Sequence, residues 1–203
     1  MLNQTAPFLY AIAGIPTAGK TSFRIKAVAK GVLPGHAFVH DCDAVMEAIP
    51  EYQQQLALEG SAAAFHKWEL TARKLAEQQL QNPIQLKRDI IYDRSCALPE
   101  SYTLIKNLVE QHGYKLIMHV LMINVDEAKK RAIHREKQHG RHLPESMIVE
   151  RLQYLRDLWP KYLQLATEAF ILDNNNFQQR IIAEYKHNKL LINDKHAYDN
   201  FLS

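Results

Sequence analysis

The sequence predicts an α/β fold in which helices pack against a parallel β-sheet. Apolar runs with strand character alternate along the chain with segments of helical period, the pattern of parallel α/β proteins. A glycine-rich phosphate-loop motif stands between the first predicted strand and the first predicted helix. The 203 residues contain no repeat and no linker rich in glycine, serine or proline, so a single domain over residues 1–203 is expected.

Each predicted strand is a short apolar run. The five runs are residues 8–13, 37–40, 89–93, 115–123 and 170–173. The main predicted helices are residues 21–30, 62–81, 99–112, 125–138 and 144–158. Gly31 ends the first of these helices, Pro83 ends the second, and Pro99 favours the first turn of the third. Residues 177–203 are expected to form a helical extension to a core of about residues 8–175.

Composition excludes several classes of protein. Apolar residues make up 47% and charged residues 23%, so the chain is not disordered or of low complexity. The net charge of +3 is too small by itself to indicate nucleic acid or a membrane as partner. Two cysteines, Cys42 and Cys96, form no disulfide framework, and neither a secretory signal nor a long apolar run is present. A cytoplasmic location is therefore expected.

A phosphate loop is the strongest motif in the sequence, because residues 14–21 match G-x-x-x-x-G-K-[ST] in full. The backbone amides of such a loop point at the β-phosphate, its lysine adds a charge for the β- and γ-phosphates, and its threonine hydroxyl holds Mg²⁺. The predicted contacts for ATP and Mg²⁺ are Gly14, Ile15, Pro16, Thr17, Ala18, Gly19, Lys20, Thr21 and Ser22.

Two aspartates, Asp41 and Asp43, follow the second predicted strand, at the edge of a parallel sheet where ligands bind. A carboxylate there can accept the proton of a substrate hydroxyl during phosphoryl transfer. The chain turns at this point, so one of the two is expected to cap the next helix instead. Asp43 directly precedes the apolar helical stretch 44–46, so the local sequence leaves both roles open.

The third predicted strand ends at Asp93, which is expected to order the water shell of Mg²⁺ or to contact substrate. Arg94 and Ser95 follow, and are expected to face the nucleotide or the acceptor. The predicted helix 62–81 is expected to pack against the sheet and to form the wall of the acceptor pocket. Its apolar stripe consists of Phe65, Trp68, Leu75 and Leu80.

Three arginines lie on and after the predicted helix 125–138. Glu127 stands four residues before Arg131, which predicts a surface ion pair, whereas Arg135 has no acid three or four residues away. Arg141 lies in a polar segment between two helices that is typical of a lid. We predict that Arg135 and Arg141 close on the phosphoryl group in transfer.

These motifs resemble the zeta toxins, a branch of the P-loop kinases related to polynucleotide 5′-kinases. The similarity covers about residues 8–175 and includes GIPTAGKT, DCDAVMEAIPEY, IIYDRS and the stretch from Gly113 to Arg135. It implies a five-stranded parallel sheet of order 2-3-1-4-5, flanked by helices, with a lid. The resemblance makes Asp43 the base, Lys20 and Thr21 the phosphate and metal contacts, and Arg135 and Arg141 the phosphoryl clamps. Asp41 is then secondary, on the substrate side with Asp93, Arg94 and Ser95.

The sequence departs from the zeta toxins at two positions. Thr17 stands where the family usually has glycine, and Asp93-Arg94-Ser95 replaces a Glu-Gly-Thr that contacts the acceptor in the toxins. Polynucleotide kinases carry an aspartate there. Zeta toxins phosphorylate UDP-N-acetylglucosamine, so the predicted activity is ATP-dependent phosphorylation of a hydroxyl on a sugar nucleotide or another small acceptor.

Two other functions fit the motifs less well. A polynucleotide 5′-hydroxyl kinase would bind nucleic acid, but no track of basic and aromatic residues for a strand is visible. A nucleotide-dependent switch acting through a protein partner needs no acceptor base, and Asp43 is present. The resemblance also implies an antitoxin as a protein partner; no membrane partner is expected.

Overall fold

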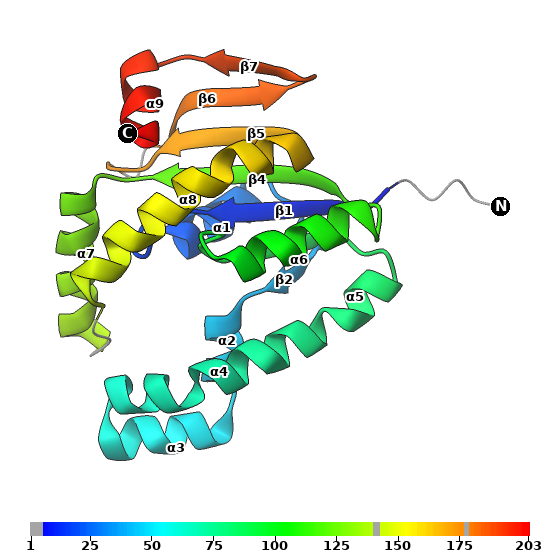
Figure 1. Cartoon of the computed structure of the whole chain (residues 1–203). Coiled ribbons are helices and arrows are strands. Elements are labelled where there is room, and N and C mark those ends of the chain that lie inside the picture. The colour runs from blue at the N-terminus through cyan, green and yellow to red at the C-terminus, as the bar shows by residue number, and fades with distance from the viewer. Residues whose placement is uncertain (1–5, 140–142, 177–178) are drawn as a thin grey trace.

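The protein is built around a twisted β-sheet with helices on both faces (Figure 1). The computed structural model describes residues 6–139, 143–176 and 179–203. Within these ranges the sheet has seven strands in the order β2-β3-β1-β4-β5-β6-β7. The strands are β1 (Phe8–Ala13), β2 (Phe38–His40), β3 (Ile90–Asp93), β4 (Lys115–Met122), β5 (Ala166–Asp173), β6 (Arg180–Lys186) and β7 (Lys189–Ile192).

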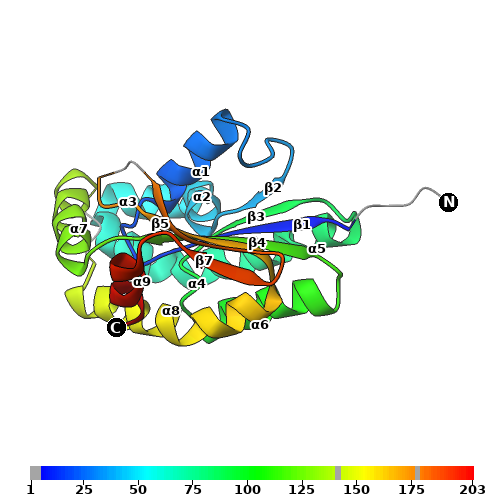
Figure 2. The same ribbon diagram turned by 90° about the horizontal axis from the view of Figure 1, so that it is seen from above.

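The helices form two layers on the sheet and a smaller group beside it. They are α1 (Lys20–Ala29), α2 (Cys42–Glu47), α3 (Pro50–Glu59), α4 (Ser61–Gln79), α5 (Gln81–Gln85), α6 (Pro99–Glu110), α7 (Val125–His139), α8 (Glu145–Leu165) and α9 (Lys195–Leu202). Helix α1 lies on one face of the sheet, and α6 and α8 lie on the other (Figure 2). None of the described helices is long and apolar enough to cross a membrane.

The parallel strands bring the predicted site residues to one edge of the sheet. Strand β1 pairs in parallel with β3 and β4, and β2 pairs in parallel with β3. His40 lies opposite Tyr92, and Ile12 lies opposite Asp93. The carboxyl ends of β1, β2 and β3 therefore meet at one edge of the sheet. The observed strand order also confirms the predicted core order 2-3-1-4-5.

The predicted helical extension over residues 177–203 is wrong. Strand β6 pairs antiparallel with β5, and β7 pairs antiparallel with β6, so within the described residues 179–203 only α9 is helical. His187 and Asn188 connect the two strands with φ of 50° and 59°, as a tight hairpin turn requires. Ile182 and Ala183 are buried against the main core, so the open edge of β5 stabilises a strand where the sequence has only weak helical character.

Three element boundaries also differ from the sequence predictions. Strand β5 begins at Ala166, and α8 continues to Leu165 through the exposed residue Pro160. Buried side chains on both sides of this proline, including Leu158 and Tyr162, anchor the helix and outweigh the lost backbone hydrogen bond. The chain also remains helical through Pro83, in the short α5.

Helices α2, α3 and α4 enclose their own small core beside the sheet (Figure 1). The prediction that the stripe on the long helix packs against the sheet is therefore wrong for most of its length. Ala64 and Ala72 of α4 are fully buried, and these small side chains let α2 and α3 approach the helix closely. Phe65 packs into this small core, whereas Leu80 reaches the main one.

A buried histidine in β4 makes stability depend on pH. The His119 ring stacks on Phe170 at 5.2 Å and lies 5.3 Å from the Phe23 ring, and its Nδ1 has no hydrogen-bond partner among the described residues. Burial lowers the pKa of His119 to about 4, from an ordinary value of 6.5. The unfolded chain binds this proton first, so stability falls as pH drops from 6.5 towards 4.

We predict that His119→Leu flattens the pH dependence of stability. In the wild type this residue alone costs about 2 kcal/mol of unfolding free energy between pH 7 and pH 5. Urea titrations at the two pH values measure the difference, with the exposed His66→Gln as control. An equal pH dependence in the wild type and His119→Leu would contradict this assignment.

Candidate active site

Two glycines and a lysine shape the phosphate loop. A Cβ at Gly14 would lie 2.7 Å from the carbonyl oxygen of Leu121, so β4 leaves space for glycine alone. Gly19 has φ of 85° and starts α1. Lys20 donates from Nζ to the carbonyl oxygens of Gly14 and Ile15, both at 3.1 Å. The Lys20 ammonium is thus held over the loop. The phosphates of a bound nucleotide would compete with these two neutral carbonyl oxygens for its hydrogen bonds.

Thr17, the departure from the family pattern, adopts the left-handed conformation with φ of 65°. Its hydroxyl lies 2.6 Å from the carbonyl oxygen of Pro16 and 2.9 Å from that of Ala128. These hydrogen-bond positions offset the strain of a positive φ in a β-branched residue. The second position also links the phosphate loop to α7.

Asp41 caps α2, and Asp43 does not. The Asp41 Oδ1 accepts hydrogen bonds from the backbone N–H of Asp43 at 3.1 Å and of Ala44 at 3.2 Å. The local sequence did not decide which of the two aspartates caps the helix; in the structure the cap is Asp41. Asp43 lies in the first turn of α2, with a half-exposed carboxylate.

Arg24 of α1 joins two strand ends. Its Nε donates to Asp93 Oδ2 at 2.8 Å, and its terminal NH2 nitrogen donates to Asp41 Oδ2 at 2.9 Å. Burial raises the pKa of Asp93, while the Arg24 hydrogen bond and the Lys20 charge act in the opposite direction. Burial lowers the pKa of Lys20, against the effect of the Asp93 carboxylate.

Arg135 and Asp43 face each other across the site. The Arg135 NH2 nitrogen lies 3.9 Å from Asp43 Oδ2, with both side chains about half exposed. Arg131, one turn earlier on α7, forms the predicted ion pair with Glu127 at 2.8 Å. Arg131 also donates to the carbonyl oxygens of Asn174 and Asn175, so it holds the end of β5.

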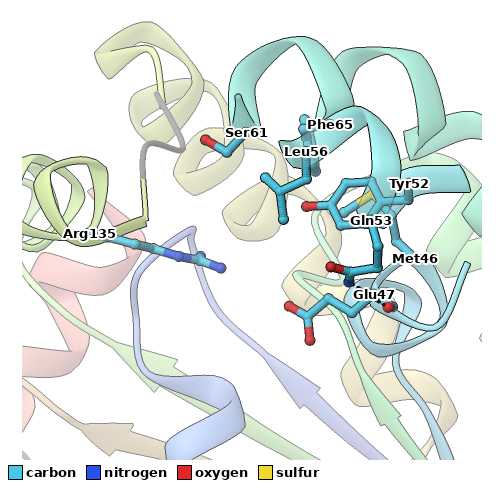
Figure 3. A pocket seen from close by; sticks show the side chains of 8 residues that line it. All are labelled: Met46, Glu47, Tyr52, Gln53, Leu56, Ser61, Phe65 and Arg135. Carbon is cyan, nitrogen blue, oxygen red and sulfur yellow. Dashed lines mark hydrogen bonds between the residues drawn. The ribbon is translucent and has the colours of Figure 1, made fainter. Parts of the chain in front are cut away.

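A pocket of about 480 Å³ opens beside Asp43 and Arg135. Its walls come from α2, α3, α4 and α7, and its lining residues are Met46, Glu47, Tyr52, Gln53, Leu56, Ser61, Phe65 and Arg135. Figure 3 shows the Arg135 side chain extending into this space, opposite Glu47 and Tyr52. Phe65 and Arg135 among these residues were named from the sequence. Glu47, Gln53 and Ser61 were missed, because their positions depend on how α3 folds back on α4.

The remaining predicted residues divide into three groups. Thr21 and Ser22 are exposed in the first turn of α1. Ser95 supports the phosphate loop, because its carbonyl oxygen accepts a hydrogen bond from the Gly14 N–H at 3.2 Å. Arg94 lies close enough to Tyr92 and Cys42 for their charges to interact with its guanidinium. Neither Arg94 nor Ser95 lines the pocket beside Asp43 and Arg135. Arg141 lies outside the described residues, as does the centre of the predicted lid.

The donor set fits Mg²⁺, which prefers hydroxyl, carboxylate and phosphate oxygens. Thr21 and Asp93 supply such oxygens beside the phosphate loop, and no group of three or more metal-binding side chains is found among the described residues.

A phosphate loop at the head of a parallel sheet of order 2-3-1-4-5, with a carboxylate and an arginine facing it, defines a P-loop kinase. The chain belongs to the zeta toxin family of these phosphotransferases, whose pattern it matches over residues 1–184. Both the predicted fold class and the predicted enzyme class are thus confirmed. A comparison with curated proteins gives no match.

Solved structures share the fold. The AvrRxo1-ORF1:AvrRxo1-ORF2 complex with ATP has a TM-score of 0.75 at 11% identity, covering 98% of this chain and 64% of that chain. The PezAT toxin-antitoxin system of Streptococcus pneumoniae has a TM-score of 0.71 at 16% identity, covering 92% and 75%. The Pnkp1/Rnl/Hen1 RNA repair complex gives 0.57 at 19% identity, covering 78% and 48%. This chain therefore spans less than two thirds of the AvrRxo1-ORF1 chain.

We predict that Lys20→Ala lowers turnover by roughly 10²-fold or more, because the transferring phosphoryl group loses its nearest fixed cation. The variant should keep the fold, since Lys20 makes its hydrogen bonds to the loop alone. Steady-state kinetics and circular dichroism measure the two effects, with the exposed Lys26→Ala on the same helix as control. Wild-type turnover in folded Lys20→Ala would refute the assignment.

Arg135 and Arg131 provide a matched pair on one helix. Arg135→Ala should lower kcat at saturating ATP by roughly 10²-fold or more, as expected for a charge that meets the phosphoryl group. Arg131→Ala should have a much smaller effect on kcat but destabilise the fold by about 1 to 2 kcal/mol, because it ties α7 to β5. Equal, mild losses of kcat in both variants would contradict a role of Arg135 in phosphoryl transfer and indicate an ordinary surface charge.

Proposed function

We propose that this kinase transfers the γ-phosphate of ATP to a hydroxyl of a small acceptor bound in the pocket beside Asp43. The observation that carries the proposal is the position of the Asp43 carboxylate, close to both Lys20 and Arg135 and on the helix that forms the pocket wall. A nucleotide switch would need neither this carboxylate nor the pocket.

The proposed reaction is a single displacement at phosphorus. The acceptor oxygen forms a bond to the γ-phosphorus, the bond to the bridging oxygen of ADP breaks, and Asp43 takes the proton of the acceptor hydroxyl. Arg135 turns from Asp43 to the γ-phosphate, where its guanidinium can bind two oxygens. Lys20 neutralises charge on the β- and γ-phosphates. Mg²⁺ bound by Thr21, with Asp93 ordering its water shell, would neutralise the developing charge further.

The acceptor proposed is a sugar nucleotide of the UDP-N-acetylglucosamine type. A volume of about 480 Å³ suits a molecule of this size. Tyr52 and Phe65 provide aromatic rings, and Glu47 provides a carboxylate that can accept hydrogen bonds from sugar hydroxyls. The Ser61 hydroxyl is buried without a partner among the described residues, so it is available to a ligand. These features support the class of acceptor, and membership of the zeta toxin family supports the particular one.

An inhibitory protein partner is proposed for the same chain. Two of the similar solved structures pair such a fold with a second protein: the PezAT toxin-antitoxin system and the AvrRxo1-ORF1:-ORF2 complex. A kinase that consumes a cellular sugar nucleotide would need such control. Co-purification with the product of a neighbouring gene, followed by loss of kinase activity on binding, tests the proposal.

An acceptor panel tests the function itself. The protein is incubated with Mg²⁺ and γ-labelled ATP together with sugar nucleotides, nucleosides or 5′-hydroxyl oligonucleotides, and the products are identified by mass spectrometry. A labelled sugar nucleotide is the expected result. Label in the oligonucleotides alone would assign the protein to the polynucleotide kinases, and release of free phosphate in every tube would indicate a switch.

The base assignment is tested by Asp43→Asn, which keeps the size of the side chain but cannot take a proton. Phosphoryl transfer should fall by roughly 10² to 10⁴-fold, while the affinity for ATP stays within a few-fold. Initial rates and ATP titration calorimetry measure the two quantities, and Asp157→Asn on the exposed face of α8 serves as control. A kcat near that of the wild type would remove Asp43 from the chemistry.

A further inference from the structure

We propose that Arg24 is a positioning residue for phosphoryl transfer, which fixes the helix that carries the base against the phosphate loop. The inference rests on the proposed function for its kinetic consequences. Arg24 lines no part of the acceptor pocket, so it acts through the residues it holds.

The geometry of Arg24 is that of a clamp between three elements. One guanidinium on α1 donates to Asp93 at the end of β3 and to Asp41 at the start of α2, at 2.8 and 2.9 Å. The three side chains are only 17%, 2% and 13% exposed, so water screens these ion pairs little. A planar guanidinium presents donors in two directions at once, whereas a lysine ammonium acts as a single point charge.

Asp41 connects Arg24 to the turn that carries the proposed base, Asp43. Its Oδ2 binds Arg24, and its Oδ1 accepts from the backbone N–H of Asp43 and of Ala44. The same carboxylate thus anchors α2 to α1 and begins the turn that carries Asp43. Helix α2 has only six residues, so its orientation depends on this end more than a long helix would.

The other end of the clamp lies at the phosphate loop. Lys20 and Arg24 stand four residues apart on α1, and therefore lie on the same face of that helix. A path of one helical turn, one ion pair and one cap connects the phosphate-binding lysine with Asp43. Loss of the ion pair between Arg24 and Asp41 frees the start of α2 and so moves the base relative to the γ-phosphate, while the hydrogen bonds of Lys20 to the phosphate loop remain.

Arg24 also sets the charge at this edge of the sheet. The negative charge of Asp41 acts to raise the pKa of Asp93, in addition to the larger effect of burial. Arg24 and Lys20 are the cations that offset this pair, while Asp43 and Arg135 form a second pair across the site. Removing Arg24 therefore leaves two largely buried carboxylates without the cation that bridges them.

The test compares three variants with a control on the same helix. Arg24→Met removes both ion pairs, Arg24→Lys keeps the charge, and Asp41→Asn keeps the capping oxygen but loses the ion pair. The exposed Lys26→Met is the control. We expect kcat to fall by roughly 10 to 10²-fold in Arg24→Met with ATP affinity within about three-fold, since misplacement by about 1 Å has effects of this size.

Two further results separate positioning from a general structural role. Arg24→Lys should recover part of kcat, and the double variant Arg24→Met/Asp41→Asn should be no slower than Arg24→Met, because both changes break one link. Losses of kcat that multiply in the double variant, or that follow the fraction of unfolded protein measured by circular dichroism, would overturn the proposal. A wild-type kcat in folded Arg24→Met would do the same.

Hydrogen exchange keeps this test independent of the acceptor. The amides of Asp43 and Ala44 should exchange at least ten-fold faster in Arg24→Met than in wild type or Lys26→Met, with α6 unchanged. If the wild type phosphorylates no acceptor, the proposed function fails while the exchange result still decides whether Arg24 holds α2. Unchanged exchange at both amides would overturn the anchoring role.

Discussion

The ion pairs of Arg24 with Asp41 and Asp93 are the constraint on which the rest of the site depends. Parallel pairing brings the ends of β1, β2 and β3 together, but it does not aim the side chains that follow them. Two largely buried carboxylates at this edge would be unfavourable without a shared cation. With Arg24 between them, one carboxylate starts α2 and the other stays beside Lys20, so Asp43 is left to face Arg135.

The proposed nucleotide half and the proposed acceptor half of the protein have separate cores. The phosphate loop is held by the sheet, where Gly14 has no space for a Cβ, and by the link from Thr17 to α7. The pocket is formed mainly by α2, α3 and α4 around their own apolar cluster. This cluster is separate from the two apolar clusters that pack on the sheet. Helix α7 joins the halves, because it contacts the loop and carries Arg135.

The sequence predicted what local chemistry determines. The five core strands are short apolar runs and the phosphate loop has fixed spacing, so both were predicted close to where they lie. The roles of Asp41 and Asp43 stayed open because a cap depends on the turn between strand and helix. Arg24 was missed because its partners lie 17 and 69 residues away; its one signal is the spacing of four from Lys20. The strands β6 and β7 were missed because pairing stabilises them: β6 pairs with the edge of β5, and β7 pairs with β6.

A structure of the protein with Mg²⁺ and a non-hydrolysable ATP analogue tests the central claim most directly. The claim is that the phosphate loop delivers the γ-phosphate to the space between Asp43 and Arg135, at the mouth of the pocket lined by Tyr52 and Phe65. We expect the β-phosphate on the loop amides, Arg135 on the γ-phosphate, and Asp43 turned to the pocket with Arg24 still bound to Asp41. A γ-phosphate directed away from Asp43, with the ion pair to Arg135 intact, would contradict the account.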